Sequence, residues 1–141
     1  MISIKNNNEQ KFADEILDRL IKFNDSKCEW FRNNRSDDKE MNFLVFNNDK
    51  LIGGAIGCIK YNWYFLDLLY VDEEYRHQNI GTKLIKEIEN LAYKENLTGV
   101  RMETWDFQAR NFYEKNGYKV FAQIEDCPPN TIDYFLKKKL K

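Results

Sequence analysis

Residues 70–88, YVDEEYRHQNIGTKLIKEI, place polar side chains where an apolar segment changes into a helical pattern. Arg76 supplies positive charge, Gly81 permits close approach to the backbone, and Thr82 adds a hydroxyl donor. Asn79 is one of the few non-glycine residue types that tolerate a left-handed conformation. The first amides of a helix lack intrahelical acceptors and carry positive potential, which suits phosphate binding. On spacing alone, this loop fits an anion site and an ordinary capped connection about equally.

The helices and strands that position this loop can be predicted from the spacing of the apolar residues along the chain. Helical spacing predicts a helix over residues 8–24 and another that starts after the loop and ends near 96–99. Asp106 is the expected N-cap of a short helix that Gly117 closes. Strands are expected at residues 2–4, in a hairpin over 41–62, and at 63–71, 100–105, 118–125 and 131–140, and residues 25–40 are left as a loop or a short helix. This order predicts an α/β (α+β) fold with a mixed sheet.

Composition limits the classes of function. The 141 residues contain 43% hydrophobic side chains and fit a single domain, 1–141, because no linker or repeat divides them. A net charge of -1 argues against nucleic acid or a membrane surface as partner. Three separated cysteines and a single histidine give no metal-site spacing, so no metal is expected. Without a signal segment or membrane span, the expected location is cytoplasmic.

Two segments in the expected order resemble the GNAT superfamily of acetyl-CoA-dependent N-acetyltransferases. RHQNIGT (76–82) is similar to its Arg/Gln-x-x-Gly-x-Gly/Ala signature, with Asn79 in place of the first glycine. ARNFYEKNGY (109–118) resembles its Phe-Tyr-Glu-Lys-x-Gly-Phe/Tyr segment, and LLYVDEEYR (68–76) its central strand and turn. The resemblance covers residue 41 to the end. It implies a mostly antiparallel sheet with a central splay and helices on both faces.

The resemblance also implies a site for acetyl-CoA as co-substrate. The pantetheine arm would lie along the backbone of Leu69, Tyr70 and Val71, with the Leu69 amide directed at the thioester carbonyl. The diphosphate would lie on the loop. The remaining cofactor-binding residues implied in this way are Arg76, His77, Gln78, Asn79, Gly81, Thr82 and Asp106. Asp106 occupies a position where many members carry asparagine.

Acetyl transfer requires a neutral amine, donors for the oxyanion and a proton for the departing thiolate. Tyr113 matches the family's tyrosine that protonates sulfur, and its alternative role is core packing. Asp67, mid-strand among apolar residues, is a candidate base and is expected on the face of Leu69 and Val71 by strand alternation. A structural hydrogen bond is its alternative role. Glu103 is the second candidate base. Its alternative roles are to bind a cationic substrate or to pair with Arg101 or a lysine.

The acceptor amine is not legible in the sequence. The function that best fits the sequence is an N-acetyltransferase that acts on a small-molecule amine through a ternary complex. The sequence shows no extended charged surface of the kind that would bind a large partner. Two other functions remain open: a non-catalytic module that senses acyl-CoA, and acetylation of a protein or aminoacyl-tRNA amine. The sequence is compatible with a homodimer and does not determine the oligomeric state.

Overall fold

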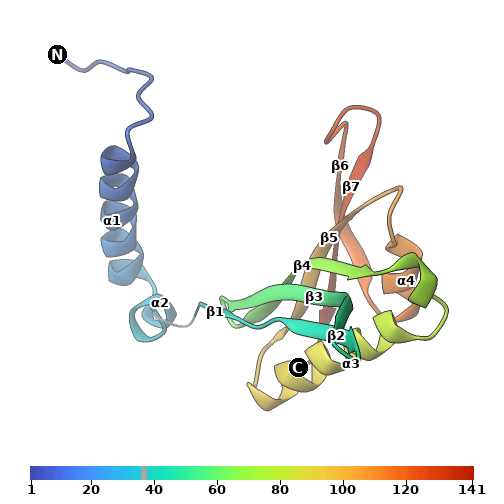
Figure 1. Cartoon of the computed structure of the whole chain (residues 1–141). Coiled ribbons are helices and arrows are strands. Elements are labelled where there is room, and N and C mark those ends of the chain that lie inside the picture. Colours follow the sequence, from blue (N-terminus) through green and yellow to red (C-terminus); the bar gives the residue numbers. More distant parts are fainter. Residues whose placement is uncertain (36–37) are drawn as a thin grey trace. The chain divides into compact units, whose positions relative to one another are not determined.

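The computed structural model describes residues 1–35 and 38–141, and the chain divides into two compact units, Met1–Ser36 and Asp37–Lys141 (Figure 1). The single domain expected over residues 1–141 stays a prediction. In the described residues, no helix is long and apolar enough to cross a membrane.

The first unit consists of helix α1 (Gln10–Lys27) and the short helix α2 (Glu29–Asn33). The predicted helix is thus confirmed, and residues 25–40 contain the short helix that was one of two alternatives. Residues 1–9 form neither helix nor strand, so the strand expected at 2–4 is wrong. A segment of only three alternating residues is too short to form a stable strand by itself.

The second unit is built on a sheet of seven strands in the part of the chain that the structure describes. Their order is β1-β3-β4-β5-β7-β6, and β2 also pairs with β3. All pairs are antiparallel except β4 and β5. The strands are β1 (Lys39–Glu40), β2 (Phe43–Asn47), β3 (Lys50–Lys60), β4 (Trp63–Val71), β5 (Gly99–Trp105), β6 (Lys119–Glu125) and β7 (Ile132–Lys139). The predicted mixed, mostly antiparallel sheet is confirmed.

One face of this sheet is covered by α3 (Ile80–Lys94) and α4 (Arg110–Lys115), and the 3-10 helix η1 (Glu73–Tyr75) precedes the loop before α3. The core forms where the apolar stripes of the two helices meet the inward side chains of the central strands. Its fully buried members include Tyr64, Ile85, Ile88, Val100, Tyr118 and Leu136.

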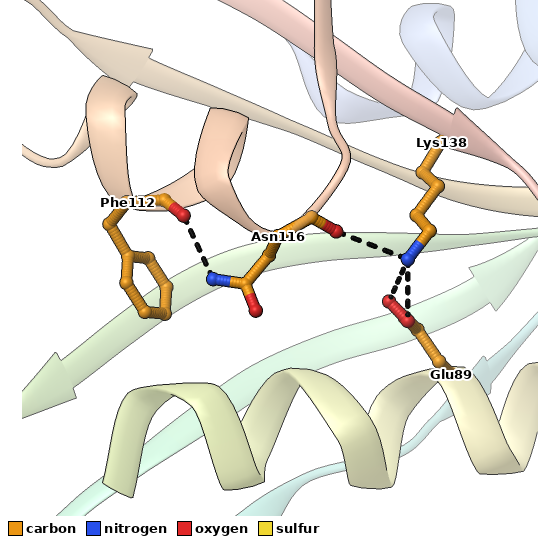
Figure 2. Close-up of polar contacts among 4 residues, drawn as sticks. All are labelled: Glu89, Phe112, Asn116 and Lys138. Carbon is orange, nitrogen blue, oxygen red and sulfur yellow. Dashed lines mark hydrogen bonds and ion pairs between the residues drawn. The ribbon is translucent and has the colours of Figure 1, made fainter. Parts of the chain in front are cut away.

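A lysine on β7 ties the two helices to the sheet (Figure 2). The Lys138 amine donates to both carboxylate oxygens of Glu89 on α3, at 2.8 and 3.1 Å. It also donates to the carbonyl of Asn116, which caps α4, at 3.1 Å, and the Asn116 amide donates to the Phe112 carbonyl at 2.8 Å. Three elements therefore share one polar junction.

The side chains of β4 do not alternate regularly, because the β3–β4 pairing contains a β-bulge. Leu66 and Leu68 pair with consecutive residues of β3, which leaves Asp67 as the extra residue. An extra residue shifts the alternation by one. Leu69 and Val71 pack against the core, whereas Asp67 is exposed. Asp67 lies mid-strand in β4 as predicted, but the prediction that it shares the face of Leu69 and Val71 is wrong.

The parallel pairing of β4 with β5 ends early. Residues Trp63–Leu66 pair with Gly99–Met102, and no pairing joins the following residues, 67–71 and 103–105. The two strands thus separate at their carboxyl ends, beside the loop before α3. The predicted central splay is confirmed.

Candidate active site

A cleft of about 1400 Å³ opens at the splay. It is bounded by the ends of β4 and β5, the loop before α3, and α4. The predicted site residues that line it are Asp67, Leu69, Tyr70, Val71, Arg76, His77, Asn79, Gly81, Thr82, Glu103 and Tyr113. The other two predicted site residues, Gln78 and Asp106, do not line this cleft.

The loop presents a run of free backbone amides. In the described residues, the amides of residues 77–82 donate to no protein acceptor. His77 and Asn79 both have left-handed backbone, with φ of 68° and 60°. Alternation of right- and left-handed residues turns successive N–H groups toward one point and makes an anion-binding concavity. The Arg76 amide, by contrast, already donates to the Glu73 carbonyl at 3.2 Å.

Arg76 binds its own chain through its side chain as well. Its Nε donates to the carbonyl of Val71 at 2.9 Å, and its guanidinium lies 5.5 Å from the centre of the Tyr70 ring. The residue therefore fixes the loop to the end of β4 and adds positive charge at the mouth of the cleft.

Gly81 has a packing role that its place in the motif did not reveal. A Cβ atom at this position would lie 3.0 Å from the ring of Phe112 on α4. The missing side chain thus lets α4 approach the start of α3. This contact holds the loop close to Tyr113, the next residue of α4.

The backbone at the end of β4 offers hydrogen-bonding groups to the splay. The Asp72 amide donates to Ile52 of β3 at 2.8 Å. Because antiparallel bonds alternate, Tyr70 also directs its amide and carbonyl at β3, whereas Leu69 and Val71 direct theirs away from it. The backbone groups that face the splay are therefore those of Leu69 and Val71 and not those of Tyr70, while contact of these three residues with a pantetheine arm stays a prediction. Of these, the Val71 carbonyl already accepts from Arg76.

Tyr113 is 6% exposed and its side chain reaches the cleft. Its ring contacts those of Phe112 and Tyr118, with centroids 5.3 and 6.3 Å apart, so its orientation is fixed. Burial raises the pKa of the Tyr113 phenol to about 12. The phenol therefore carries its proton throughout the neutral range and is available as a donor.

Three carboxyl groups lie on the sheet face opposite α3 and α4. Asp67 and Glu103 were predicted; Asp133 on β7 was not. Partial burial, followed by a hydrogen bond and repulsion from Asp133, raises the pKa of Glu103, while Arg101 opposes this shift. Asp133 is 5% exposed. The signal for it was available, because Asp133 is an acid within the apolar segment IDYFL, as Asp67 is within WYFLDLLYV.

Asp106 does not cap α4, which corrects the sequence prediction. The helix begins at Arg110, its N-cap is Ala109, and Asp106 is exposed. Gln108 closes the connection instead, since its side-chain oxygen accepts from the Trp105 amide at 2.9 Å. Gly117 follows the helix with φ of 91°, as predicted.

Cys58 also lines the cleft, but its chemistry does not suit a nucleophile. Burial raises the pKa of its thiol, so the reactive thiolate is disfavoured. Cys58 is therefore poorly suited to form a covalent intermediate.

A splayed sheet that offers free backbone groups beside an anion-binding helix terminus is the architecture of an acyl-CoA-dependent transferase. Comparison with known proteins agrees: the chain belongs to the acetyltransferase (GNAT) family, whose sequence model matches residues 7–118. The predicted acyltransferase class is thereby confirmed.

Individual relatives carry the same class name. The chain is 40% identical over 92 residues, 64% of its length and 68% of the relative's, to blasticidin-S acetyltransferase of Streptomyces morookaense. Among solved structures, it resembles an acetyltransferase of Bacillus cereus ATCC 14579, with a TM-score of 0.87, 28% identity and 98% of each chain covered. It also resembles the PaiA N-acetyltransferase of Thermoplasma acidophilum in complex with coenzyme A, with a TM-score of 0.63, 26% identity, and 79% and 67% coverage.

Proposed function

We propose that this protein transfers the acetyl group of acetyl-CoA to a primary amine of a small molecule by direct attack in a ternary complex. The observation that carries the proposal is the cleft at the splay, which joins six free loop amides, the Leu69 backbone and the Tyr113 phenol. The solved relative with bound coenzyme A supports the choice of co-substrate.

In this proposal the loop and β4 orient acetyl-CoA. The amides of residues 77–82 bind its diphosphate, and the positive potential of the α3 terminus adds to their effect. The free amide and carbonyl of Leu69 pair with the pantetheine arm, as an added strand would. The Leu69 amide then donates to the thioester oxygen, where negative charge develops during attack.

Proton transfer is assigned to side chains at the cleft. An acid on the open sheet face, Glu103 or Asp67, accepts the proton of the incoming ammonium, directly or through water. The neutral amine attacks the carbonyl carbon, the C–S bond breaks, and Tyr113 gives its proton to the departing sulfur. The remaining extra proton on the acylated nitrogen then passes through solvent to the tyrosinate, which leaves a neutral amide and restores the phenol. Because the pKa of Glu103 is raised, this carboxylate is a stronger base than an ordinary glutamate.

The acceptor class is proposed from both the cleft and a relative. The open face combines acids with Phe65, Trp105 and Phe107, which suits a small organic cation. The relative named blasticidin-S acetyltransferase supports an amine-bearing antibiotic as one candidate. No described feature favours a macromolecular acceptor.

The test is thiol release from acetyl-CoA with a panel of small amines, amine antibiotics and basic peptides. Transfer to at least one small amine, with the acetylated product identified by mass spectrometry, is the expected result. Acetyl-CoA binding without transfer to any amine would favour the sensing module instead. Transfer to peptides alone would move the acceptor to the protein class.

A further inference from the structure

The sheet face opposite α3 and α4 holds a pair of carboxyl groups, Glu103 and Asp133, and acetyl transfer needs at most one of them, because Asp67 is an alternative base. Glu103 on β5 and Asp133 on β7 occupy diagonal positions on this face, since Trp105 pairs with Asp133 and Glu103 with Phe135. Asp133 is 5% exposed, yet its side chain lines the cleft. A carboxyl group this deeply buried is costly unless cations or hydrogen-bond donors surround it.

Among the described residues, no cationic side chain forms an ion pair with these two acids. Cations share this face, but Arg101 lies over the ring of Phe65 at 4.2 Å, Lys137 over that of Phe121 at 5.0 Å and Lys60 over that of Tyr61 at 5.2 Å. Glu103, which meets the Asp133 side chain, is another acid.

A carboxylate beside another acid is repelled by it, which favours the protonated form of that carboxyl group. Partial burial and the proximity of Asp133 raise the pKa of Glu103, Asp67 adds to this effect, and Arg101 opposes it. Glu103 therefore retains its proton to higher pH than an ordinary glutamate would. A cation that replaces this proton removes the repulsion and satisfies both groups.

Aromatic side chains beside the pair favour an organic cation over a metal ion. Trp105, directly opposite Asp133, stacks on Phe107, with ring centroids 6.0 Å apart and planes 8° apart. Phe107 lines the cleft and is 69% exposed in the free protein. Its open face can cover an ammonium or guanidinium group and exclude water from it.

We infer that the acceptor is an organic dication: one amine receives the acetyl group at the splay, and a second cationic group binds between Glu103 and Asp133. The inference rests on the proposed N-acetyltransferase function and narrows its acceptor class. A cation bound there opposes protonation of Glu103, so binding releases the proton from whatever fraction of Glu103 carries it.

The first test compares acceptors that differ only in the second charge. Butylamine has one cation, 1,4-diaminobutane has two, and 4-guanidinobutylamine replaces one ammonium with guanidinium. We expect kcat/KM to favour the two dications on the order of tenfold or more. Asp133→Asn should reduce this preference to below about threefold, whereas Glu125→Gln, an exposed acid outside the cleft, should keep it. The ratio between the two dications distinguishes ammonium from guanidinium.

The second test does not depend on transfer. Calorimetric titration of 1,4-diaminobutane into the coenzyme A-loaded protein, in two buffers of different ionisation enthalpy, measures protons released on binding. We expect release at pH 5–6 in the natural protein and none in Glu103→Gln. Coenzyme A affinity serves as the folding control, and Glu103→Gln carries the test if Asp133→Asn does not fold.

The outcomes separate the inference from the proposed function. Equal binding of butylamine and 1,4-diaminobutane, or binding of the diamine without proton release, overturns the dication site even if acetyl transfer occurs. Proton-linked diamine binding without transfer to any amine supports the site and refutes the proposed reaction.

Discussion

Tyr113 combines burial with access to the cleft, and its role as acid can be tested by removing a single oxygen. In Tyr113→Phe the ring contacts remain, but no proton is available for the departing sulfur. We expect kcat to fall on the order of 10²-fold or more while the affinity for acetyl-CoA hardly changes. Steady-state kinetics with calorimetry of acetyl-CoA binding measures both. An unaltered kcat would remove Tyr113 from the mechanism.

Glu103, a candidate base, is expected to lower the folding stability of the protein at neutral pH. Since its folded-state pKa is raised, the folded protein binds this proton more tightly than the unfolded chain. Stability is therefore lost as pH rises from about 4, the ordinary glutamate range, through the raised value. We expect Glu103→Gln to match the natural protein in Tm below about pH 4 and to exceed it toward neutral pH. Scanning calorimetry against pH checks this, with Glu125→Gln as the control; a constant difference would contradict the shift.

For single residues, the sequence predicted the backbone conformation that a residue type favours better than it predicted which other residues surround it. Asn79 is left-handed as expected, because few side chains tolerate that conformation. Asp67 was assigned to the wrong face, since a single bulge residue reverses the alternation on which the prediction depended. Asp133 was missed because its partner, Glu103, is 30 residues distant and only the β5–β7 pairing brings the two acids together.

The loop before α3 is an element whose unpaired amides can be observed directly. In the free protein the amides of residues 77–82 have no protein acceptor in the described part of the chain, so they should exchange with solvent rapidly. Coenzyme A bound by these groups should slow their exchange, while the neighbouring Arg76 amide, already bonded to Glu73, should change less. Hydrogen exchange followed by NMR resolves the individual amides. Unchanged exchange at residues 77–82 in saturated protein would contradict anion binding by the loop.

The junction of Lys138 with Glu89 and Asn116 ties three elements together (Figure 2). The side chains of Lys138 and Glu89 are 31% and 14% exposed, so removing the cation leaves a mostly buried acid unpaired. We expect Lys138→Met to lower the free energy of unfolding by roughly 1–3 kcal/mol. Denaturant unfolding measures this loss. The double variant with Glu89→Gln should be more stable than the sum of the single losses implies, and strict additivity would argue against the junction.

Most elements could be predicted because their apolar periods are strong. The predicted strand at 63–71 coincides with β4, and the helix after the loop begins at Ile80. The predicted start of α4 was wrong because two nearby residues can both close the turn before it. Asp106 is a residue type that commonly caps helices, but Gln108 closes this connection and α4 begins at Arg110. The splay could not be read from periodicity, because strand patterns do not report where pairing ends; only the family resemblance supplied it.

For the molecule as a whole, every residue that lines the cleft belongs to the second unit, Asp37–Lys141. A ligand that binds this folded unit and not the unfolded chain stabilises it by mass action. We expect acetyl-CoA at 100 times its Kd to add about 2.7 kcal/mol to the free energy of unfolding and to raise Tm by several degrees. S-acetylpantetheine has the same thioester and pantetheine arm but lacks the nucleotide diphosphate. At the same concentration it should stabilise far less, because the amides of residues 77–82 then have no anion to bind. Equal stabilisation by the two thioesters, measured by thermal unfolding, would mean that the arm alone carries the affinity and that the helix terminus is not the nucleotide site.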